Sequence, residues 1–355
     1  MQSYRQDKPF NERIRELIRD THAVNGPLSV MKRGKRFEVI RNPVTWRVSG
    51  EMTVTDGIGT KGMLHWIKGN IENAVVDAFA MVTNGLAEGG YLPFMLQDHI
   101  MMQEEDEGKI LRVVDKLVSL CLSNRWPWPQ DHTTVSPIAI TGGETAIIGT
   151  LKGLEIGITA TGYVIEGGRI GKAPKLGDLI IGIGSSGVHS NGLSFFVNNI
   201  NARSELAVEI LDELTKPTAV YLQAINELIS ELDSKGGANA YLRGMVHITG
   251  GGLSKLKELV EARRDIDINI GRRNELKPQW IFEYAHGALH VPSEKMYRTF
   301  NNGIGYAIVV DPSIADEALR VLSRSHNADM IGEVTAGSGR VAIESRYDYT
   351  TVVYE

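Results

Sequence analysis

The sequence predicts a mixed fold of α/β or α+β type in two α/β domains, and two observations carry this prediction. The chain has 355 residues, more than one hydrophobic core usually supports. In both halves, apolar segments with the period of a strand alternate with segments that have the period of a helix. Glu166-Gly167-Gly168 separates the halves. We therefore expect domains at residues 1–166 and 167–355.

Apolar spacing also predicts the elements of the first half. Ile71 to Ala87 and Ile110 to Leu122 have helical spacing, and Leu92 to Gln97 between them predicts a strand. Pro43 marks a break in an extended segment rich in β-branched residues. The other predicted elements of this half are a helix at 11–22, extended segments within 37–55, a loop at 126–129, and strands at 137–140 and 155–165.

The second half opens with a strand, a glycine-rich turn and a helix. The apolar run Leu179 to Ile183 predicts the strand, and a helical pattern begins at Leu193. Between them, Gly184 to Gly192 reads Gly-Ser-Ser-Gly-Val-His-Ser-Asn-Gly. Beyond this turn we expect helices near 217–233 and 253–262 and a strand at 305–310.

Composition narrows the functional classes. The net charge of -5 argues against a nucleic-acid partner, which would normally require a basic excess. The sequence has no uninterrupted apolar stretch long enough to span a membrane and no charged-then-apolar leader, so we expect a cytoplasmic protein with no membrane partner. The single cysteine, Cys121, excludes an internal disulfide and any multi-cysteine metal site.

The turn Gly184 to Gly192 has the features of a phosphate-binding loop. Glycines let backbone N–H groups converge, and the first turn of the following helix presents unpaired donors. Serine hydroxyls and the Asn191 amide add further partners. The alternative is a tight turn capped by Ser190 or Asn191. His189 favours ligand binding, because an imidazole titrates near neutral pH and is suited to act as a general acid.

Thr55-Asp56-Gly57-Ile58-Gly59-Thr60-Lys61 is a second glycine-bearing motif, and it closes the extended segment of the first half. The Asp56 carboxylate is suited to a cation, and Lys61 is suited to a phosphate as a point charge. Asp56 equally suits a turn or a helix cap, and Lys61 equally suits a solvated surface position.

Two more motifs lie at predicted element boundaries. Thr141-Gly142-Gly143-Glu144-Thr145 follows the strand predicted at 137–140, and Glu144 there suits either Mg²⁺ or a turn cap. His247-Ile248-Thr249-Gly250-Gly251-Gly252-Leu253 is a turn into a helix. We interpret His247 as a core residue rather than a catalytic one.

Together, and in this order, the four motifs closely resemble those of the aminoimidazole ribonucleotide synthetase family, the phosphoribosylformylglycinamidine cyclo-ligases. The resemblance covers about residues 50–340 of the chain. It implies two α/β domains, the first with a sheet that pairs with its copy in a second subunit, and hence a homodimer. Further matching segments are Pro217-Thr218 with Tyr221, Met296 to Asn301, Gly303-Ile304-Gly305, and Ile331 to Val334.

The resemblance implies ATP-dependent cyclisation of formylglycinamidine ribonucleotide in purine biosynthesis, with ATP and Mg²⁺ as cofactors and a small-molecule nucleotide as substrate. The domain at 1–166 would bind ATP and form the dimer contact, and the domain at 167–355 would hold the substrate loops. Carried over by motif, the metal ligands are Asp56, Glu144 and Asp98; the ATP-binding residues are Asp56, Gly57, Gly59, Thr60, Lys61, Gly143, Glu144 and Thr145; the substrate-binding residues are Ser185, Ser186, Gly187, His189, Ser190, Asn191, Thr249, Gly250 and Gly251; and the catalytic residues are His189 and Lys61.

The first half departs from the family pattern. Asn84-Gly85 stands where the family has an Asn-Asp pair whose aspartate helps to hold the metal-nucleotide. Residues 24–49 lack the family's Gly- and Phe-rich loop, and Ile147-Ile148-Gly149 replaces its Met-Pro-Gly stretch. Two alternatives to the cyclo-ligase follow. One is an ATP-using relative with another substrate, and the other is a ligand-binding relative without phosphoryl transfer.

Overall fold

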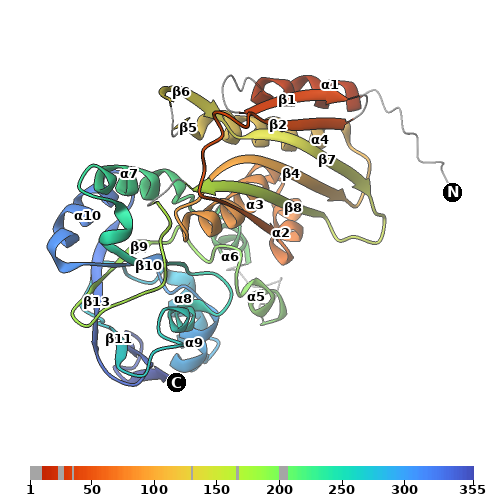
Figure 1. Ribbon diagram of the computed structural model, residues 1–355. Helices are drawn as coiled ribbons and strands as arrows, with labels where there is room; N and C mark the ends of the chain where they lie inside the picture. Colours follow the sequence, from red (N-terminus) through yellow and green to blue (C-terminus); the bar gives the residue numbers. More distant parts are fainter. Residues whose placement is uncertain (1–9, 23–27, 34–35, 129–130, 165–167, 200–206) are drawn as a thin grey trace. The chain divides into compact units, whose positions relative to one another are not determined.

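The computed structural model describes residues 10–22, 28–33, 36–128, 131–164, 168–199 and 207–355, which form two compact units (Figure 1). Unit 1 comprises Met1–Leu86 and Leu92–Ile165, and unit 2 comprises Ala87–Tyr91 and Glu166–Glu355. Each unit is built on its own sheet, so the fold is mixed α/β with two sheet-based units.

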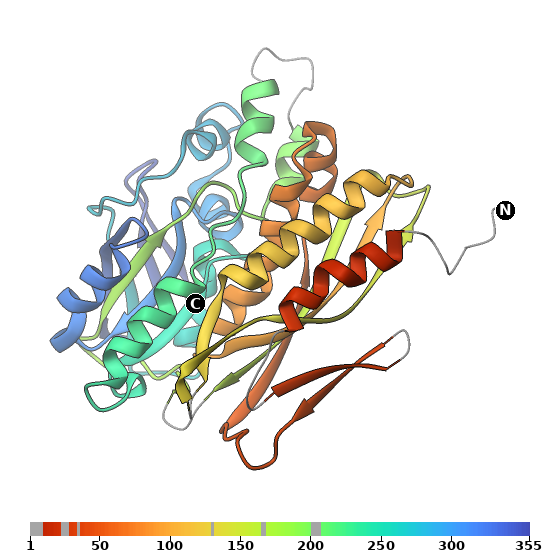
Figure 2. The same ribbon diagram turned by 90° about the horizontal axis from the view of Figure 1, so that it is seen from above.

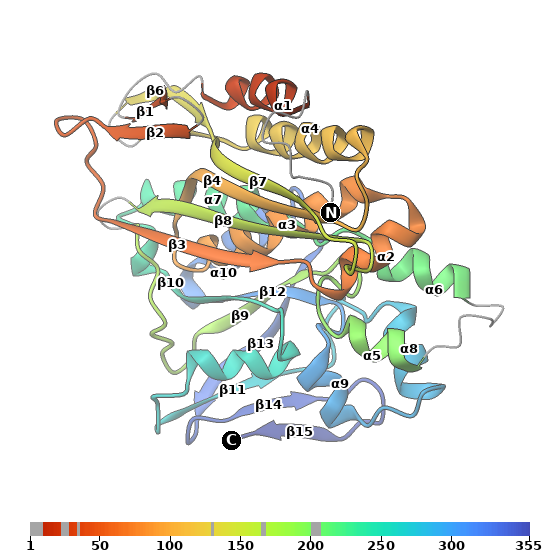
Figure 3. The same cartoon turned by 90° about the vertical axis from the view of Figure 1, so that its right-hand side faces the viewer.

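The main sheet of unit 1 has the strand order β3-β8-β4-β7 (Figure 3). β4 and β7 run parallel, and the other neighbours run antiparallel. The strands are β3 Gly50–Gly57, β4 Leu92–Met102, β7 Ala139–Ile147 and β8 Leu154–Val164, and the helices of this unit are α1 Phe10–Arg19, the 3₁₀ helix η1 Asp20–His22, α2 Thr60–Lys68, α3 Ile71–Ala87 and α4 Glu107–Ser123.

The two faces of this sheet differ in what covers them. Ile158 of β8 is buried on one face. Asp56 of β3 and Asp98 of β4 pair with Ile158, so their side chains point to the same face. The helix α3 packs there, because Val54 of β3 lies 3.6 Å from the position that a Cβ on Gly85 would take. The side chains of the opposite face are polar and mostly exposed; they include Thr55, Gln97, His99 and Glu144.

Two hairpins complete unit 1. They are β1 Leu28–Arg33 with β2 Arg36–Arg41, and β5 Arg125–Trp128 with β6 Asp131–Pro137. Leu28 of β1 packs in a buried cluster with Ala139 and Tyr163 of the main sheet. The first hairpin therefore covers one end of the polar face.

Unit 2 is built on a seven-stranded sheet of order β10-β12-β9-β13-β11-β14-β15. Its neighbours are antiparallel except for β11 and β14. The helices α7 (Leu222–Asp233) and α10 (Ala315–Leu322) lie side by side, and α10 contacts β9 and β13 (Figure 2). The strands are β9 Leu179–Gly184, β10 Leu242–His247, β11 Ile266–Ile270, β12 Ile304–Val310, β13 Ala328–Ala336, β14 Val341–Glu344 and β15 Thr351–Tyr354.

The helices of unit 2 surround this sheet. The 3₁₀ helix η3 packs against it over a core of Ile, Leu and Val side chains, which includes Leu253 and Leu256. The helical elements are α5 Leu193–Asn199, α6 Ala207–Leu214, α7 Leu222–Asp233, η2 Ala238–Ala240, η3 Gly252–Leu259, α8 Trp280–Gly287, α9 Ser293–Thr299, η4 Pro312–Ile314 and α10 Ala315–Leu322.

Four predicted elements differ from the structure. The predicted loop at 126–129 is largely the strand β5, where Trp126 is buried and its indole N–H donates to the Pro93 carbonyl at 2.9 Å. The motif at 141–145 lies inside β7 rather than after the end of a strand, and its polar residue Glu144 is on the exposed face of that strand. The helix near 217–233 begins only at Leu222, and the helix at 253–262 is the 3₁₀ helix η3.

Candidate functional site

The turn between β3 and α2 already holds an anion of the protein itself. The backbone N–H groups of Ile58 and Gly59 donate to Glu155 Oε1 at 3.0 and 3.1 Å. Gly59 has φ 54, a conformation that favours glycine. Burial, outweighing those two hydrogen bonds, and the nearby Asp56 charge raise the pKa of the Glu155 carboxyl. A carboxylate thus occupies the donors that the sequence assigns to a phosphate.

Lys61 is not a surface lysine, and in this structure its amine does not face solvent. Its side chain is fully buried in α2, and Nζ lies 2.7 Å from Asp77 Oδ1. His65 Nε2 lies 2.7 Å from the other Asp77 oxygen. Burial alone would raise the pKa of Asp77, but Lys61 and His65 outweigh it and lower that pKa. The geometry therefore gives Lys61 an anchoring position under the turn instead of the predicted phosphate contact.

The three carboxylates predicted to bind Mg²⁺ do not gather in one place. Asp56 and Asp98 both pair with Ile158 in the register of the sheet, on the helix-covered face and two strands apart, which is about 10 Å. Glu144 pairs with His99 and points to the opposite face. Within the described residues, no group of three His, Cys, Asp or Glu side chains forms a metal-binding cluster.

The surroundings of Asp98 disfavour the charged form of its carboxyl group, which is the form that binds a metal ion. Its carboxylate covers Gly143, whose Cβ position would lie 2.5 Å from Asp98 Oδ2. Burial, together with the Glu144 charge, raises the pKa of Asp98 to about 7. The neighbouring Thr145 N–H donates to Glu144 Oε1 at 3.1 Å. Glycine at 143 thus gives room to a neighbouring side chain, so its presence does not by itself indicate a nucleotide.

The turn after β9 has fewer available donors than the sequence predicts. The Gly184 N–H donates to the Asn327 carbonyl at 2.8 Å, and the Ser185 N–H donates to the Gly303 carbonyl at 2.9 Å. The Ser186 N–H donates to His189 Nε2 at 3.2 Å. The first three N–H groups of this predicted phosphate cradle are therefore satisfied within unit 2.

His189 is a buried part of the turn rather than a side chain open to solvent. It has φ 58, a left-handed backbone that costs energy for a non-glycine residue. Its ring is fully buried, 6.2 Å from the Tyr221 ring and 6.3 Å from the His247 ring between centroids. Because Nε2 accepts from the Ser186 N–H, the structure supports a positioning role in place of the predicted general acid.

The other predicted substrate residues come together on the far side of this turn. Ser190 Oγ and Thr218 Oγ1 lie 3.3 Å apart. The position of a Cβ on Gly250 would be 3.8 Å from Asn191 Oδ1, so the two substrate motifs meet here. The Asn191 Nδ2 atom is buried and has no hydrogen-bond partner among the described residues. It is a donor available to a ligand.

A carboxylate and an amine support the motif at 247–253. The His247 N–H donates to Glu88 Oε1 at 2.8 Å. Lys255 Nζ donates to the His247 carbonyl at 3.0 Å and to Thr249 Oγ1 at 3.1 Å. His247 itself is buried, and burial with the nearby His189 and Lys255 charges holds its pKa well below the usual value. The interpretation of His247 as a core residue fits this geometry.

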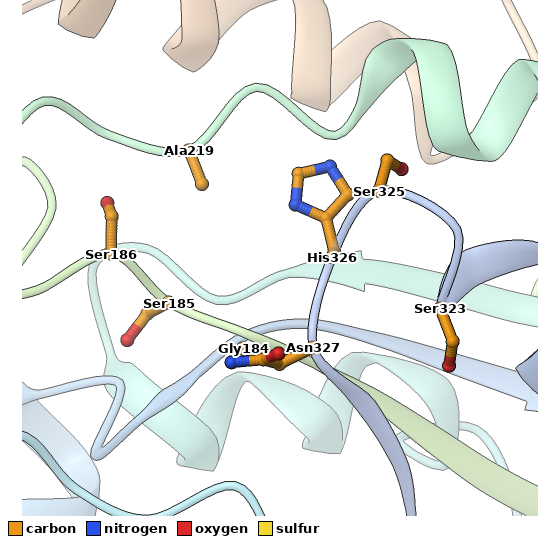
Figure 4. Close-up of a pocket in the computed structure, with 8 residues that line it drawn as sticks. All are labelled: Gly184, Ser185, Ser186, Ala219, Ser323, Ser325, His326 and Asn327. Carbon is orange, nitrogen blue, oxygen red and sulfur yellow. The ribbon is translucent and has the colours of Figure 1, made fainter.

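A polar hollow of about 480 Å³ adjoins the turn after β9 (Figure 4). One side is the turn itself, and the other is the segment that links α10 to β13. The eight lining residues are Gly184, Ser185, Ser186, Ala219, Ser323, Ser325, His326 and Asn327.

Two residues of these sites were missed from the sequence: Glu155 and His326. Asp77 carries a signal in the sequence, because an acid in the middle of the mostly apolar helix Ile71 to Ala87 needs a buried partner, which here is Lys61. Glu155 at the start of a strand and His326 in a polar segment belong to no motif, so no local pattern distinguishes them.

Comparisons with known proteins agree with this architecture. A family model described as "AIR synthase related protein, C-terminal domain" matches residues 175–344. The chain is 33% identical over 303 residues to the phosphoribosylformylglycinamidine cyclo-ligase of Methanothermobacter thermautotrophicus, covering 82% of this chain and 81% of that protein. It is 30% identical over 312 residues to the Carboxydothermus hydrogenoformans cyclo-ligase, covering 81% of this chain and 82% of that protein.

Solved structures show the same fold at lower identity. Escherichia coli HypE is 18% identical with a TM-score of 0.64, over 97% of this chain and 96% of that chain. The hydrogenase maturation protein HypE in complex with ATP is 16% identical with a TM-score of 0.56, over 86% and 85%. At these identities, the likeness concerns the fold.

Proposed function

Because the chain belongs to the AIR synthase family, we propose that it catalyses the ATP-dependent closure of formylglycinamidine ribonucleotide to aminoimidazole ribonucleotide. One observation carries the proposal: cyclo-ligases match four fifths of the chain at 30% identity or more. An ATP-using enzyme is also consistent with the ATP complex of HypE, a protein of the same fold.

The proposed reaction has two steps. The amide oxygen of the substrate attacks the γ-phosphorus of ATP, the bond to ADP breaks, and an iminophosphate forms. The substrate's own amine then attacks that carbon, the C–O bond breaks, phosphate leaves, and a proton is lost as the ring closes. The protein's contribution is to position the reactants and to neutralise charge, as in other phosphoryl transfers.

The first turn supports phosphate recognition. Ile58 and Gly59 already direct two N–H groups at one carboxylate oxygen, which is the arrangement that a phosphate oxygen requires. If the Glu155 side chain turns away, these donors receive the nucleotide. Lys61 keeps the turn in place through Asp77. The carboxylates Asp56, Asp98 and Glu144 do not fit a single Mg²⁺ site as they stand, so no step is assigned to the metal.

A ligand-binding relative without phosphoryl transfer is the second candidate, and Gly85 favours it. The family aspartate is missing there, and among the described residues Asp56 belongs to no group of three His, Cys, Asp or Glu side chains that could hold a metal ion. The site would accept a side chain, because the Cβ of residue 85 would meet only Val54 at an ordinary 3.6 Å.

Purified protein with ATP, Mg²⁺ and formylglycinamidine ribonucleotide tests the proposal. We expect ADP and aminoimidazole ribonucleotide in equal amounts, and a faster reaction in Gly85→Asp. Substrate binding by calorimetry without ADP release in either protein would refute the cyclo-ligase and favour the second candidate. Gly85→Asn is the matched control, since it adds similar volume without charge.

We also propose a homodimer through the exposed polar face of the sheet in unit 1. Thr55, Gln97, His99 and Glu144 lie on this face without a covering helix among the described residues. Sedimentation at micromolar concentration tests it, and a monomer that is fully active would refute it.

A further inference from the structure

The hollow beside the turn after β9 is polar but uncharged. None of its eight described lining residues is Asp, Glu, Lys or Arg. Ser323, Ser325 and Asn327 are exposed and follow directly on α10 (Figure 4). A site for a phosphate dianion usually includes a cationic side chain or several unpaired N–H groups.

His326 presents a hydrogen-bond acceptor to this hollow. Its ring packs 5.2 Å from the Tyr221 ring, and it projects into the view of Figure 4 between Ala219 and Ser325. Burial lowers the pKa of His326, while a hydrogen bond to the Val220 carbonyl opposes the shift. The neutral ring uses its one N–H on that carbonyl, so its other nitrogen is an acceptor.

The surrounding backbone also disfavours an anion. The hollow lies at the carboxyl end of α10, where helix carbonyls carry partial negative charge. The N–H groups of Ser323 and His326 donate back to helix carbonyls, and those of Gly184, Ser185 and Ser186 are satisfied within the unit. The hydroxyls of Ser185 and Ser186 already donate to Asn301 Oδ1 and to the Pro217 carbonyl. The lining groups left for a ligand are the hydroxyls of Ser323 and Ser325, the Asn327 amide and an imidazole nitrogen.

We propose that this hollow binds the sugar hydroxyls of a ribose-bearing ligand, with His326 accepting a hydrogen bond from one of them. The inference rests on the proposed function, in which the substrate is a ribonucleotide. The proposal assigns the two sides of the turn after β9 to different parts of the ligand. The hollow takes the uncharged sugar, and the Asn191 side offers the unpartnered amide to a charged group.

His326→Phe tests the acceptor, because it keeps the ring against Tyr221 and removes the nitrogen. We expect KM for formylglycinamidine ribonucleotide to rise about three- to tenfold, with kcat and the KM for ATP unchanged, as for one lost hydrogen bond. His286→Phe is the control. His286 Nδ1 also pairs with a backbone carbonyl, that of Val291 at 2.7 Å, and its ring lies 4.8 Å from Tyr347, but it does not line the hollow.

Ala219→Leu tests the hollow itself, because the larger side chain fills it. Saturation-transfer NMR with D-ribose 5-phosphate does not depend on turnover: we expect sugar signals with the wild type and the His286→Phe control, and weaker ones with Ala219→Leu. Unchanged thermal unfolding shows that each variant is folded.

The outcomes separate the two proposals. Turnover in the wild type with unchanged KM in both hollow variants refutes the sugar site and leaves the function standing. Sugar signals that Ala219→Leu abolishes, without turnover in the wild type, refute the function and support the site. Sugar signals that persist in Ala219→Leu but disappear with inorganic phosphate show recognition of phosphate alone, and they refute the site.

Discussion

The two glycine-rich turns differ in what accepts their backbone hydrogen bonds. At the turn between β3 and α2, both N–H groups donate to the side chain of Glu155. At the turn after β9, the acceptors are the carbonyls of Gly303 and Asn327 and the ring of His189. A carboxylate on a flexible side chain is able to rotate away, whereas a backbone carbonyl moves only if its segment does.

Similar glycine-rich sequences can therefore differ in whether their backbone donors are open to a ligand. The first turn keeps donors that a ligand is able to take over. The second is a fixed frame, held by fully buried rings such as Tyr221 and His189. Under the proposed function, we therefore expect the nucleotide phosphates at the first turn, and we expect the second turn to contribute the neutral hydrogen bonds of the hollow and the Asn191 amide.

The largest expected effect concerns the anchor under the first turn. Lys61→Met leaves the Asp77 carboxylate buried without its cation, so we expect the free energy of unfolding to fall by about 3 to 5 kcal/mol. Urea unfolding measures it. The control, Lys152→Ala, removes an exposed lysine of the same unit. Equal losses in the two variants would contradict the buried pair.

A pair of glycine substitutions compares the rigidity of the two turns directly. In Gly305→Ala the new Cβ would lie 1.9 Å from the Tyr221 hydroxyl and 2.7 Å from His189 Cε1, so we expect a loss of about 1 to 3 kcal/mol in unfolding free energy. In Gly57→Ala it would meet Glu155 Oε1 at 2.7 Å, and that side chain can move. Similar losses in both variants would break the comparison.

The fold should be less stable in acid, because His247 is buried beside His189 of the second turn. The folded-state pKa of His247 lies well below its usual value, so the unfolded chain binds more protons below about pH 6.5 and stability falls as the pH drops through that window. His247→Phe keeps a ring beside Tyr306 and removes the titration. Between pH 7.5 and 5.0 we expect the variant to lose about 1 to 2 kcal/mol less than the wild type in urea unfolding. An identical pH profile would show that His247 does not titrate on unfolding.

The smallest expected effect on stability is at Glu155, yet this variant sharpens the comparison most. Glu155→Ala removes two hydrogen bonds of a half-buried side chain, which costs about 1 kcal/mol. It also frees two donors, so we expect tighter ATP binding in calorimetry, with Glu155→Gln intermediate. Weaker ATP binding in Glu155→Ala would mean that Glu155 holds the turn in its binding conformation and does not compete with phosphate.

Local periodicity was sufficient to predict most elements. The helix α3 is confirmed because its apolar residues recur at helical spacing, and the strand β9 is confirmed because its short, continuous apolar run is buried at consecutive positions. The prediction that the motif at 141–145 follows the end of a strand was wrong. Its glycines and polar residues lie in a strand with one uncovered face, and such a strand has the composition of a loop.

Burial of the polar site residues was harder to predict. Lys61 and His189 occur in motifs that suggest contact with a ligand, but each is enclosed by residues distant in sequence, Asp77 in one case and His247 in the other. Which face a carboxylate occupies depends on strand register, and register separates Glu144 from Asp98. No pattern in a single sequence fixes these long-range pairings.

The short stretch Ala87–Tyr91 shows that the two units are not two successive stretches of the sequence. It lies between two segments of unit 1 but is part of unit 2. There Glu88 accepts the His247 N–H, and the Gly89 carbonyl accepts the Ile170 N–H at 3.1 Å. A fragment that begins at residue 166 would therefore lack residues 87–91 of unit 2. A chimaera that exchanges its second half with a relative would combine residues 87–91 of one protein with the rest of unit 2 from the other. In this chain, a compact unit of the structure is not one continuous stretch of sequence.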